Sequence, residues 1–214
     1  MATRLEGTNA MGTPNLTLVG HLWPASSVNW TRTILLAVLG SAIVALAAQV
    51  SVPMLPVPMT LQTLAVLTVG GAYGARLGAG TLALYALEGA VGLPVFANFQ
   101  AGLFLPTGEI IATGGYIIGF IVAAGLVGYL VEKGWGASIL KLCAAMLLGA
   151  AVLYIPGLIW LAAWLGIIKG MDATSAMTVA LTSGMLPFIP GDIIKAVLAA
   201  LAFPAAFSLL GRKA

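Results

Sequence analysis

Long apolar runs, separated by short groups of glycine, proline and charged residues, dominate the chain. The runs are continuous, without the strict alternation of a half-buried strand or the polar face of a surface helix. They cover about residues 33–50, 59–73, 79–93, 114–130, 139–168 and 174–210. Since a membrane-crossing helix needs about 20 mostly apolar residues, the pattern predicts an all-α integral membrane protein with six transmembrane helices.

Proline and glycine divide the runs. Segment 51–58 follows the first run and contains three prolines, which prevent a regular helix. Irregular backbone at membrane depth is tolerated only where protein buries it or where it lines a cavity. We therefore expect this loop to pack against the rest of the protein or to cover a cavity. Further interruptions are expected at the turn 74–78, in the long segment 94–113, and at Pro156-Gly157, Pro187, Pro190-Gly191 and Pro204.

Composition agrees with a lipid environment. Hydrophobic residues make up 61% of the chain and charged residues 7%, whereas a soluble domain averages about 45–50% and about 25%. The mean hydropathy is +1.09. The 214 residues hold six helices with short loops. We expect a cytoplasmic tail at 1–31 and one six-helix substrate-binding domain at 32–212.

Several function classes lack the residues they need. The sequence contains no Walker-type phosphate loop, so ATP hydrolysis by this chain alone is not expected. A metal site or a bound cofactor is not expected either, because Cys143 and His21 are the single cysteine and the single histidine. The basic residues are scattered, which argues against nucleic-acid binding. No nucleophile–base set is recognisable, so we do not expect an enzyme.

Lysine and arginine are unequally shared between the two sides of the predicted bundle. Lys169 is alone on one side. The other side collects Arg4, Arg32, Arg76, Lys133, Lys141, Arg212 and Lys213. The positive-inside rule places the richer side in the cytoplasm. We expect a multi-pass protein of a bacterial cytoplasmic membrane with both termini inside, and with the apolar loops outside, as a lidded pocket requires.

Three ionisable residues lie within the apolar runs, namely Glu88, Asp192 and Lys195. A charge in the bilayer core costs about 2.5–3.5 kcal/mol on insertion scales, which makes each a functional candidate. Asp192 and Lys195 are three positions apart and share a helix face. They would suit a ligand with N–H donors and a carboxylate. Alternatively, Asp192 offsets a helix dipole, Lys195 is its ion-pair partner, and Glu88 is a boundary residue near water.

Other side chains are weaker candidates for a pocket. Tyr116, Tyr154 and Trp160 could line one, or could belong to an interfacial aromatic belt, which suits Trp164 better. Gln62 and Asn98 lie near outward-facing ends. They either bind a neutral ligand group or satisfy loop backbone.

Small residues recur every fourth position in the first run, at Ala37, Ser41 and Ala45. Such a stripe allows close approach of another helix. The neighbour is either another helix of this chain or a partner subunit docked in the membrane.

Five segments together resemble one known family over about residues 33–210. They are Val57-Pro-Met-Thr-Leu-Gln-Thr-Leu64, Gly74-Ala-Arg-Leu-Gly78, Tyr85 with Gly89-Ala-Val-Gly-Leu-Pro-Val-Phe-Ala97, Thr113-Gly-Gly-Tyr-Ile-Ile-Gly-Phe120 and Pro190-Gly-Asp-Ile-Ile-Lys195. The combination resembles the BioY family, the biotin-specific S components of energy-coupling-factor (ECF) transporters. The segment between Ala97 and Thr113 departs from the family pattern and is longer.

The resemblance implies a high-affinity biotin-binding membrane subunit with six helices and an outward-facing pocket. Uptake would be driven by a transmembrane coupling protein and two ABC-type ATPase subunits. By the same resemblance, Lys195 would bind the valerate carboxylate, Asp192 the ureido N–H groups, and Tyr116 would contact biotin. Ala37, Ser41 and Ala45 would dock on the coupling protein. The alternatives are an S component for another small anionic vitamin and a stand-alone biotin facilitator.

Overall fold

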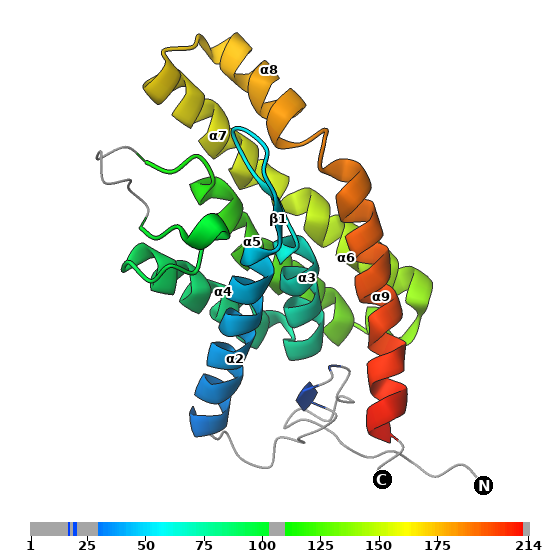
Figure 1. The fold of residues 1–214 in the computed structure, drawn as a ribbon. Helices are drawn as coiled ribbons and strands as arrows, with labels where there is room; N and C mark the ends of the chain where they lie inside the picture. Colours follow the sequence, from blue (N-terminus) through cyan, green and yellow to red (C-terminus); the bar gives the residue numbers. More distant parts are fainter. Residues whose placement is uncertain (1–16, 18, 21–29, 103–109, 212–214) are drawn as a thin grey trace, which may run out of the picture.

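A computed structural model describes residues 17, 19–20, 30–102 and 110–211. This part of the chain is almost wholly helical (Figure 1). The N-terminal tail predicted at 1–31 lies almost entirely outside the described residues. The helices are α2 Trp30–Gln49, α3 Gln62–Tyr73, α4 Ala75–Ala90, α5 Gly114–Glu132, α6 Ile139–Val152, α7 Tyr154–Lys169, α8 Ala173–Gly184 and α9 Ile189–Gly211, with short 3₁₀ turns η1 Ala97–Phe99 and η2 Trp135–Ala137.

These helices form six regions, as the apolar runs predict. α6 and α7 continue into one another as a single helix of 31 residues. α8 and α9 are two halves of one region, bent by 47°. Among the described residues, α2, α5 and α6–α7 are long and apolar enough to cross a membrane, and the bent pair is a possible fourth span. α3 and α4 have only 12 and 16 residues, so tilt or local bilayer thinning has to make up the missing length.

Two expected interruptions are wrong in detail. The predicted turn at 74–78 is mostly helix, because Gly74 alone reverses the chain with a φ of 84°. α4 then begins at once, and the carboxylate of Glu132 accepts the N–H of Ala75 at 2.9 Å, satisfying one of the donors that a helix start leaves free. α9 also continues through Pro204.

The other prolines act near their expected positions. The junction between α6 and α7 falls at Leu153, just before Pro156, whose ring clashes with the carbonyl four residues earlier. α8 ends before Pro187, and Pro190 lies in the first turn of α9, where its missing N–H needs no helical partner.

The proline-rich loop is more regular than expected. Its ends form a two-stranded antiparallel pair, β1 Ser51–Val52 with β2 Met59–Thr60, in which Ser51 pairs with Thr60. Between the strands, Val57 is buried. The hairpin lies at the same end of the molecule as the α7–α8 connection, opposite the start of α2 (Figure 1).

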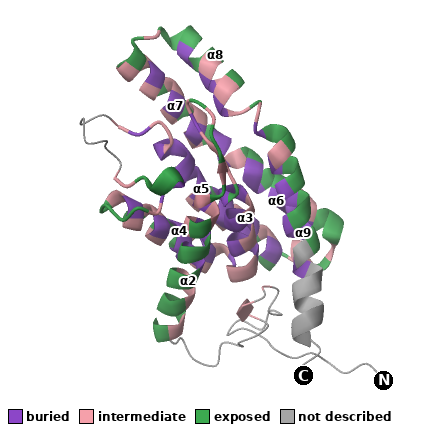
Figure 2. Ribbon diagram, viewed as in Figure 1, coloured by how far each residue is buried: buried purple, intermediate pink, exposed green. Residues whose placement is uncertain are grey.

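α5 is the centre of the bundle, and its neighbours approach its backbone closely. Residues such as Ala123 and Val127 are completely buried, and the buried residues concentrate on the inner helices in Figure 2. A Cβ built on Gly115 would lie 2.3 Å from the carbonyl oxygen of Pro156, and one on Gly119 would lie 2.5 Å from that of Leu153. These glycines let α7 lie against α5, as small residues do between membrane helices.

The α5–α7 contact gives the first prediction. We expect Gly119→Ala to lower the thermal unfolding midpoint, because the added methyl group meets backbone atoms of Leu153 that have little room to move. Overpacking of this kind costs about 1–3 kcal/mol. Differential scanning fluorimetry in detergent would measure the change.

The matched control is Gly80→Ala on α4, where a Cβ meets nothing within 4 Å. Its midpoint should equal or slightly exceed that of the unsubstituted protein. Equal midpoints for the two variants would contradict the proposed close packing of α5 on α7.

Candidate functional site

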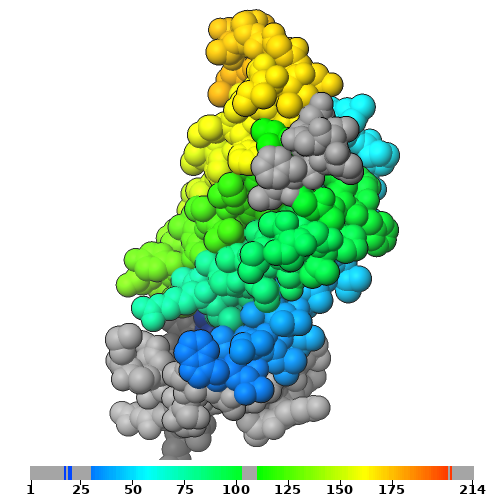
Figure 3. All heavy atoms as spheres, turned by 90° about the vertical axis from the view of Figure 1, so that its left-hand side faces the viewer, coloured from blue at the N-terminus to red at the C-terminus, as the bar shows by residue number. Residues whose placement is uncertain are grey.

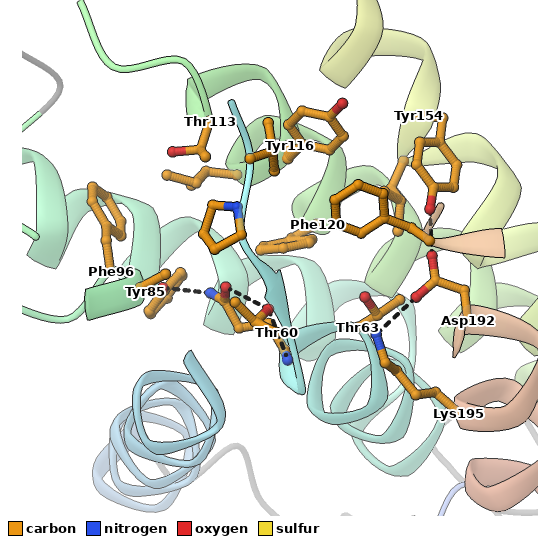
Figure 4. A pocket seen from close by; sticks show the side chains of 17 residues that line it. Thr60, Thr63, Tyr85, Phe96, Thr113, Tyr116, Phe120, Tyr154, Asp192 and Lys195 are labelled. Carbon is orange, nitrogen blue, oxygen red and sulfur yellow. Dashed lines mark hydrogen bonds and ion pairs between the residues drawn. The ribbon is translucent and has the colours of Figure 1, made fainter. Parts of the chain in front are cut away.

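A cavity lies under the hairpin and between the inner helices (Figure 4). Its wall combines the hairpin, the start of α3, single residues of α4 and α7, the first turns of α5, and the start of α9. The residues that line it are Val57, Pro58, Thr60, Gln62, Thr63, Tyr85, Phe96, Ala97, Thr113, Tyr116, Ile117, Phe120, Leu153, Tyr154, Phe188, Asp192 and Lys195.

The cavity is of the size that a small molecule needs. The empty space between its walls, including the mouth, is about 590 Å³, within the range of small-molecule sites.

A buried acid–base pair forms one end of the cavity. Lys195 Nζ lies 3.0 Å from Asp192 Oδ1, and the hydroxyl of Tyr154 donates to Asp192 Oδ2 at 2.5 Å. Asp192 is 5% exposed and Lys195 9%. Two charges this deep need each other and additional hydrogen bonds, because desolvation otherwise exceeds their attraction.

Secondary structure fixes the geometry of this pair. Asp192 lies in the first turn of α9, where the helix dipole favours a negative charge. Its backbone N–H donates to the carbonyl of Phe188 at 2.8 Å. Lys195 follows one turn later on the same face. Asp192 and Lys195 thus share a helix face, as expected from the sequence for a ligand-binding pair. They also form the ion pair that was the alternative interpretation.

Uncharged polar groups form a second cluster on the cavity wall. The side-chain amide of Gln62 donates to the Tyr85 hydroxyl at 2.7 Å, and the Thr60 hydroxyl donates to Gln62 Oε1 at 3.0 Å. Tyr85 in turn donates to the carbonyl of Val95 at 3.0 Å. Since an amide has two N–H donors and two acceptor lone pairs, Gln62 keeps one of each for a ligand.

Tyr116 presents its ring to the cavity rather than its hydroxyl. The hydroxyl donates to the carbonyl of Gly184 at 2.8 Å and so ties α5 to the end of α8. Its ring lies edge-on to that of Tyr154, with centroids 6.2 Å apart. These two tyrosines, with Phe120 and Phe188, give the cavity an aromatic side (Figure 4).

The structure brings five of the seven proposed binding residues together: Lys195, Asp192, Tyr116, Tyr154 and Gln62. It places the other two outside the cavity wall.

Trp160 and Asn98 support loop backbone. The indole N–H of Trp160 donates to the carbonyl of Ile111 at 2.8 Å, holding the segment before α5. Asn98 is exposed, and its side-chain oxygen accepts from the Ser51 hydroxyl at 3.2 Å. It lines a different, outer pocket. For Asn98 the alternative of satisfying loop groups fits better than ligand contact.

Sequence reasoning missed Tyr85 and Thr60 as lining residues. Tyr85 is completely buried within an apolar helix. A buried tyrosine hydroxyl needs a hydrogen-bond partner, and this signal could have paired it with a nearby polar residue such as Gln62. Nothing in the local sequence of Thr60 indicates that its side chain faces a cavity.

The small-residue stripe of α2 faces inward. Ser41 is 1% exposed, and its hydroxyl donates to the carboxylate of Glu88 on α4. Ala37 and Ala45 are half-buried. This geometry favours internal packing, the alternative to docking. Glu88 is partly exposed, so the bond to Ser41 is compatible with its alternative interpretation as a boundary residue near water. The exposed face of α2 carries Ile34, Leu35, Val38, Leu39, Ile43 and Leu46.

The described residues hold no group of three or more histidine, cysteine, aspartate or glutamate side chains that could bind a metal ion. The cavity wall offers hydrogen-bonding groups, one ion pair and aromatic surface. Such a set can hold a small polar molecule with an apolar part.

The chain is similar to known proteins over most of its length. The model of the BioY family matches residues 13–212. A protein of Rhizobium etli named biotin transporter BioY is 36% identical over 181 residues, which cover 80% of this chain and 90% of that protein. A protein of Thermotoga maritima with the same name is 36% identical over 170 residues, covering 79% of this chain and 92% of its own.

A solved structure shares the fold. The 2.1 Å crystal structure of the S-component for biotin from an ECF-type ABC transporter matches with a TM-score of 0.65 at 24% identity, covering 84% of this chain and 93% of that one. The all-α S-component fold predicted from the sequence is confirmed, and the chain is a multi-pass membrane protein. Since the family model spans nearly the whole sequence, this chain belongs to the BioY family.

Proposed function

We propose that this protein is the biotin-binding S component of an ECF transporter. It would collect biotin outside a bacterial cytoplasmic membrane, with both termini in the cytoplasm. The observation that carries the proposal is the Asp192–Lys195 pair, buried beside aromatic rings in a cavity of a membrane-embedded bundle. Family membership and the names of the relatives support biotin as the ligand.

The roles proposed for the two charges follow from complementarity. Lys195 is a compact cation and binds the valerate carboxylate. Asp192 accepts hydrogen bonds from the ureido N–H groups, and such charge-assisted bonds are roughly twice as strong as neutral ones. Before biotin arrives, the two charges neutralise each other. Biotin brings one carboxylate and N–H donors. Its carboxylate takes the place of Asp192 as the partner of Lys195, and its N–H groups take the place of Lys195 as donors to Asp192.

The remaining lining residues suit the uncharged parts of biotin. The second N–H and lone pair of Gln62 can hydrogen-bond a polar ligand group beside Tyr85. Tyr116, Tyr154 and Phe120 offer ring faces and edges to the thioether ring and the aliphatic chain. Sulfur–aromatic contacts of this kind are worth about 0.3–1.5 kcal/mol.

The partners are a transmembrane coupling protein and two ABC-type ATPase subunits. The sequence supplies no phosphate loop, so energy for uptake against a gradient has to come from elsewhere. The alternative is a stand-alone facilitator, which equilibrates biotin without ATP. In either case the site binds and releases biotin and leaves it chemically unchanged.

The binding site is tested first with Lys195→Ala. We expect biotin affinity to fall by roughly 30-fold or more, because truncating one member of a buried hydrogen-bonded charge pair costs about 2–5 kcal/mol. Isothermal titration of the purified protein measures it. Lys141→Ala, at an exposed lysine near the start of α6, is the matched control and should bind as the unsubstituted protein does.

Lys195→Ala leaves Asp192 buried with a single partner and could unfold the bundle. The unfolding midpoint is therefore measured alongside, and Tyr154→Phe provides a milder change that removes only the hydrogen bond to Asp192. It should weaken binding by roughly three- to tenfold. Unchanged biotin affinity in folded Lys195→Ala protein would refute the assignment of this site.

The energy source is tested in proteoliposomes. We expect labelled biotin to accumulate above its external concentration only when the coupling protein, both ATPase subunits and internal ATP are present. Liposomes with this chain alone should bind biotin without accumulating it. Equilibration of biotin by this chain alone, at a rate that the ATPase module and ATP leave unchanged, would instead establish the facilitator alternative.

A further inference from the structure

A second, larger pocket adjoins the binding cavity on the hairpin side. It lies between the hairpin, the segment 110–113 and helices α7 and α8. The empty space in it, including its mouth, is about 1900 Å³, against about 590 Å³ in the inner cavity. Pro58 and Thr113 line both. Space for a whole small molecule therefore exists beside the inner cavity, and two residues contribute to the walls of both.

The wall of this outer pocket carries a cation held over an indole ring. Lys169 Nζ lies 5.7 Å from the ring centroid of Trp164, within the range of a cation–π contact. The indole N–H of Trp164 donates to the carbonyl of Ile110 at 2.8 Å, which fixes the ring. Trp164 is half-buried and Lys169 is exposed, so the positive charge is positioned at the wall yet remains open to solvent.

Lys169 is the free positive charge at this end of the described structure. Lys195 is committed to Asp192, whereas no carboxylate of the described residues forms an ion pair with Lys169. The nearest acid in sequence, Asp172, instead caps α8 by accepting the N–H groups of Thr174 and Ser175, both at 3.1 Å. Hydrogen bonds from Ser175 and Thr174 lower the pKa of the Asp172 carboxyl. Asp172 therefore stays charged, and its carboxylate is bonded to the N–H groups at the start of α8 rather than to Lys169.

The other described cations outside the inner cavity lie at the opposite end of the molecule. Arg32 is in the first turn of α2, Arg76 is in the first turn of α4, Lys133 directly follows α5, and Lys141 is in the first turn of α6. In Figure 3 the yellow residues of α7 and α8 and the cyan hairpin lie at one end, and the blue start of α2 lies towards the other. An organic anion approaching the hairpin end therefore meets Lys169 before any other described cation.

We propose that the outer pocket is a capture site for the carboxylate of the incoming ligand, with Lys169 as its anchoring charge. The inference rests on the proposed function of the inner cavity. The ligand carboxylate first pairs with Lys169, while Trp164, Leu165 and the hairpin prolines contact the apolar part. The ligand then passes Pro58 and Thr113 into the inner cavity. Lys169 thus sets how fast anionic ligands arrive, while Asp192 and Lys195 set how long they stay.

The proposal predicts a change in the association rate constant of the ligand and no change in its dissociation rate constant. A charge at the rim of a site mainly alters the association rate and its salt dependence, whereas buried charges alter dissociation. In the full-length protein, Lys169→Gln should lower the association rate constant of biotin by roughly threefold or more at low ionic strength. The dissociation rate constant should stay the same. The difference should shrink near 1 M salt, where the screening length is about 3 Å.

The chain offers a matched control. Lys133 also lies over an aromatic ring, with Nζ 5.4 Å from the centroid of Tyr129, but at the other end of the molecule. Lys133→Gln should leave both rate constants unchanged. Lys169→Arg, which keeps the positive charge, should associate with biotin at the rate of the unsubstituted protein. Rapid-filtration binding of radiolabelled ligand in detergent measures all four cases.

The outcomes separate this proposal from the one on which it rests. If the unsubstituted protein binds biotin and Lys169→Gln associates equally fast at low salt, the capture site is refuted and the inner site stands. An equally slowed association of biotin with Lys169→Arg would mean that the shape of the Lys169 side chain matters instead of its charge, which also refutes the capture site. If folded, ligand-free protein does not bind biotin at all, the proposed function fails first.

Discussion

The contact of Asp192 with Lys195 and Tyr154 is the constraint around which the rest of the molecule is organised. In a chain with only 7% charged residues, it puts two opposite charges deep in an apolar bundle. Each is tolerable there because the other charge neutralises it, and Asp192 also accepts a hydrogen bond from the Tyr154 hydroxyl. Tyr154 is the first residue of α7, and Asp192 lies in the first turn of α9. The break at Leu153 and the bend between α8 and α9 are thus the places where the helices present their polar side chains to a shared cavity.

Packing between the helices holds the starts of α7 and α9 in place beside the cavity. Gly115 and Gly119 let α7 approach α5 closely, and Tyr116, between them, links α5 to the end of α8. The inward-facing Ser41 fixes α2 against α4 through Glu88, so the small residues of α2 contribute to the same internal packing. The hairpin covers the inner cavity and contributes residues to the walls of both the inner cavity and the larger outer pocket.

Sequence reasoning anticipated the helices because the lipid environment makes apolar runs long and continuous. It anticipated Asp192 and Lys195 for a related reason, since a charge within such a run is conspicuous and costly. It failed where backbone hydrogen bonding across the fold decides the outcome. The cap that Glu132 gives to α4 and the pairing of Ser51 with Thr60 join segments that no local pattern connects. Trp160, which is half-buried, and Tyr85, which is buried, show the same limit, because which aromatic residue faces a cavity depends on helix rotation.

The most direct measurement is a calorimetric titration of the purified, ligand-stripped protein with biotin, with thiamine and riboflavin titrated in parallel. The account predicts tight, saturable binding of biotin at one site per chain and no detectable binding of the other two. Thiamine is cationic and would meet Lys195, and riboflavin lacks the carboxylate that replaces Asp192 as the partner of that lysine. Absent biotin binding by folded protein, or equal binding of all three vitamins, would contradict the claim that the buried pair recognises biotin.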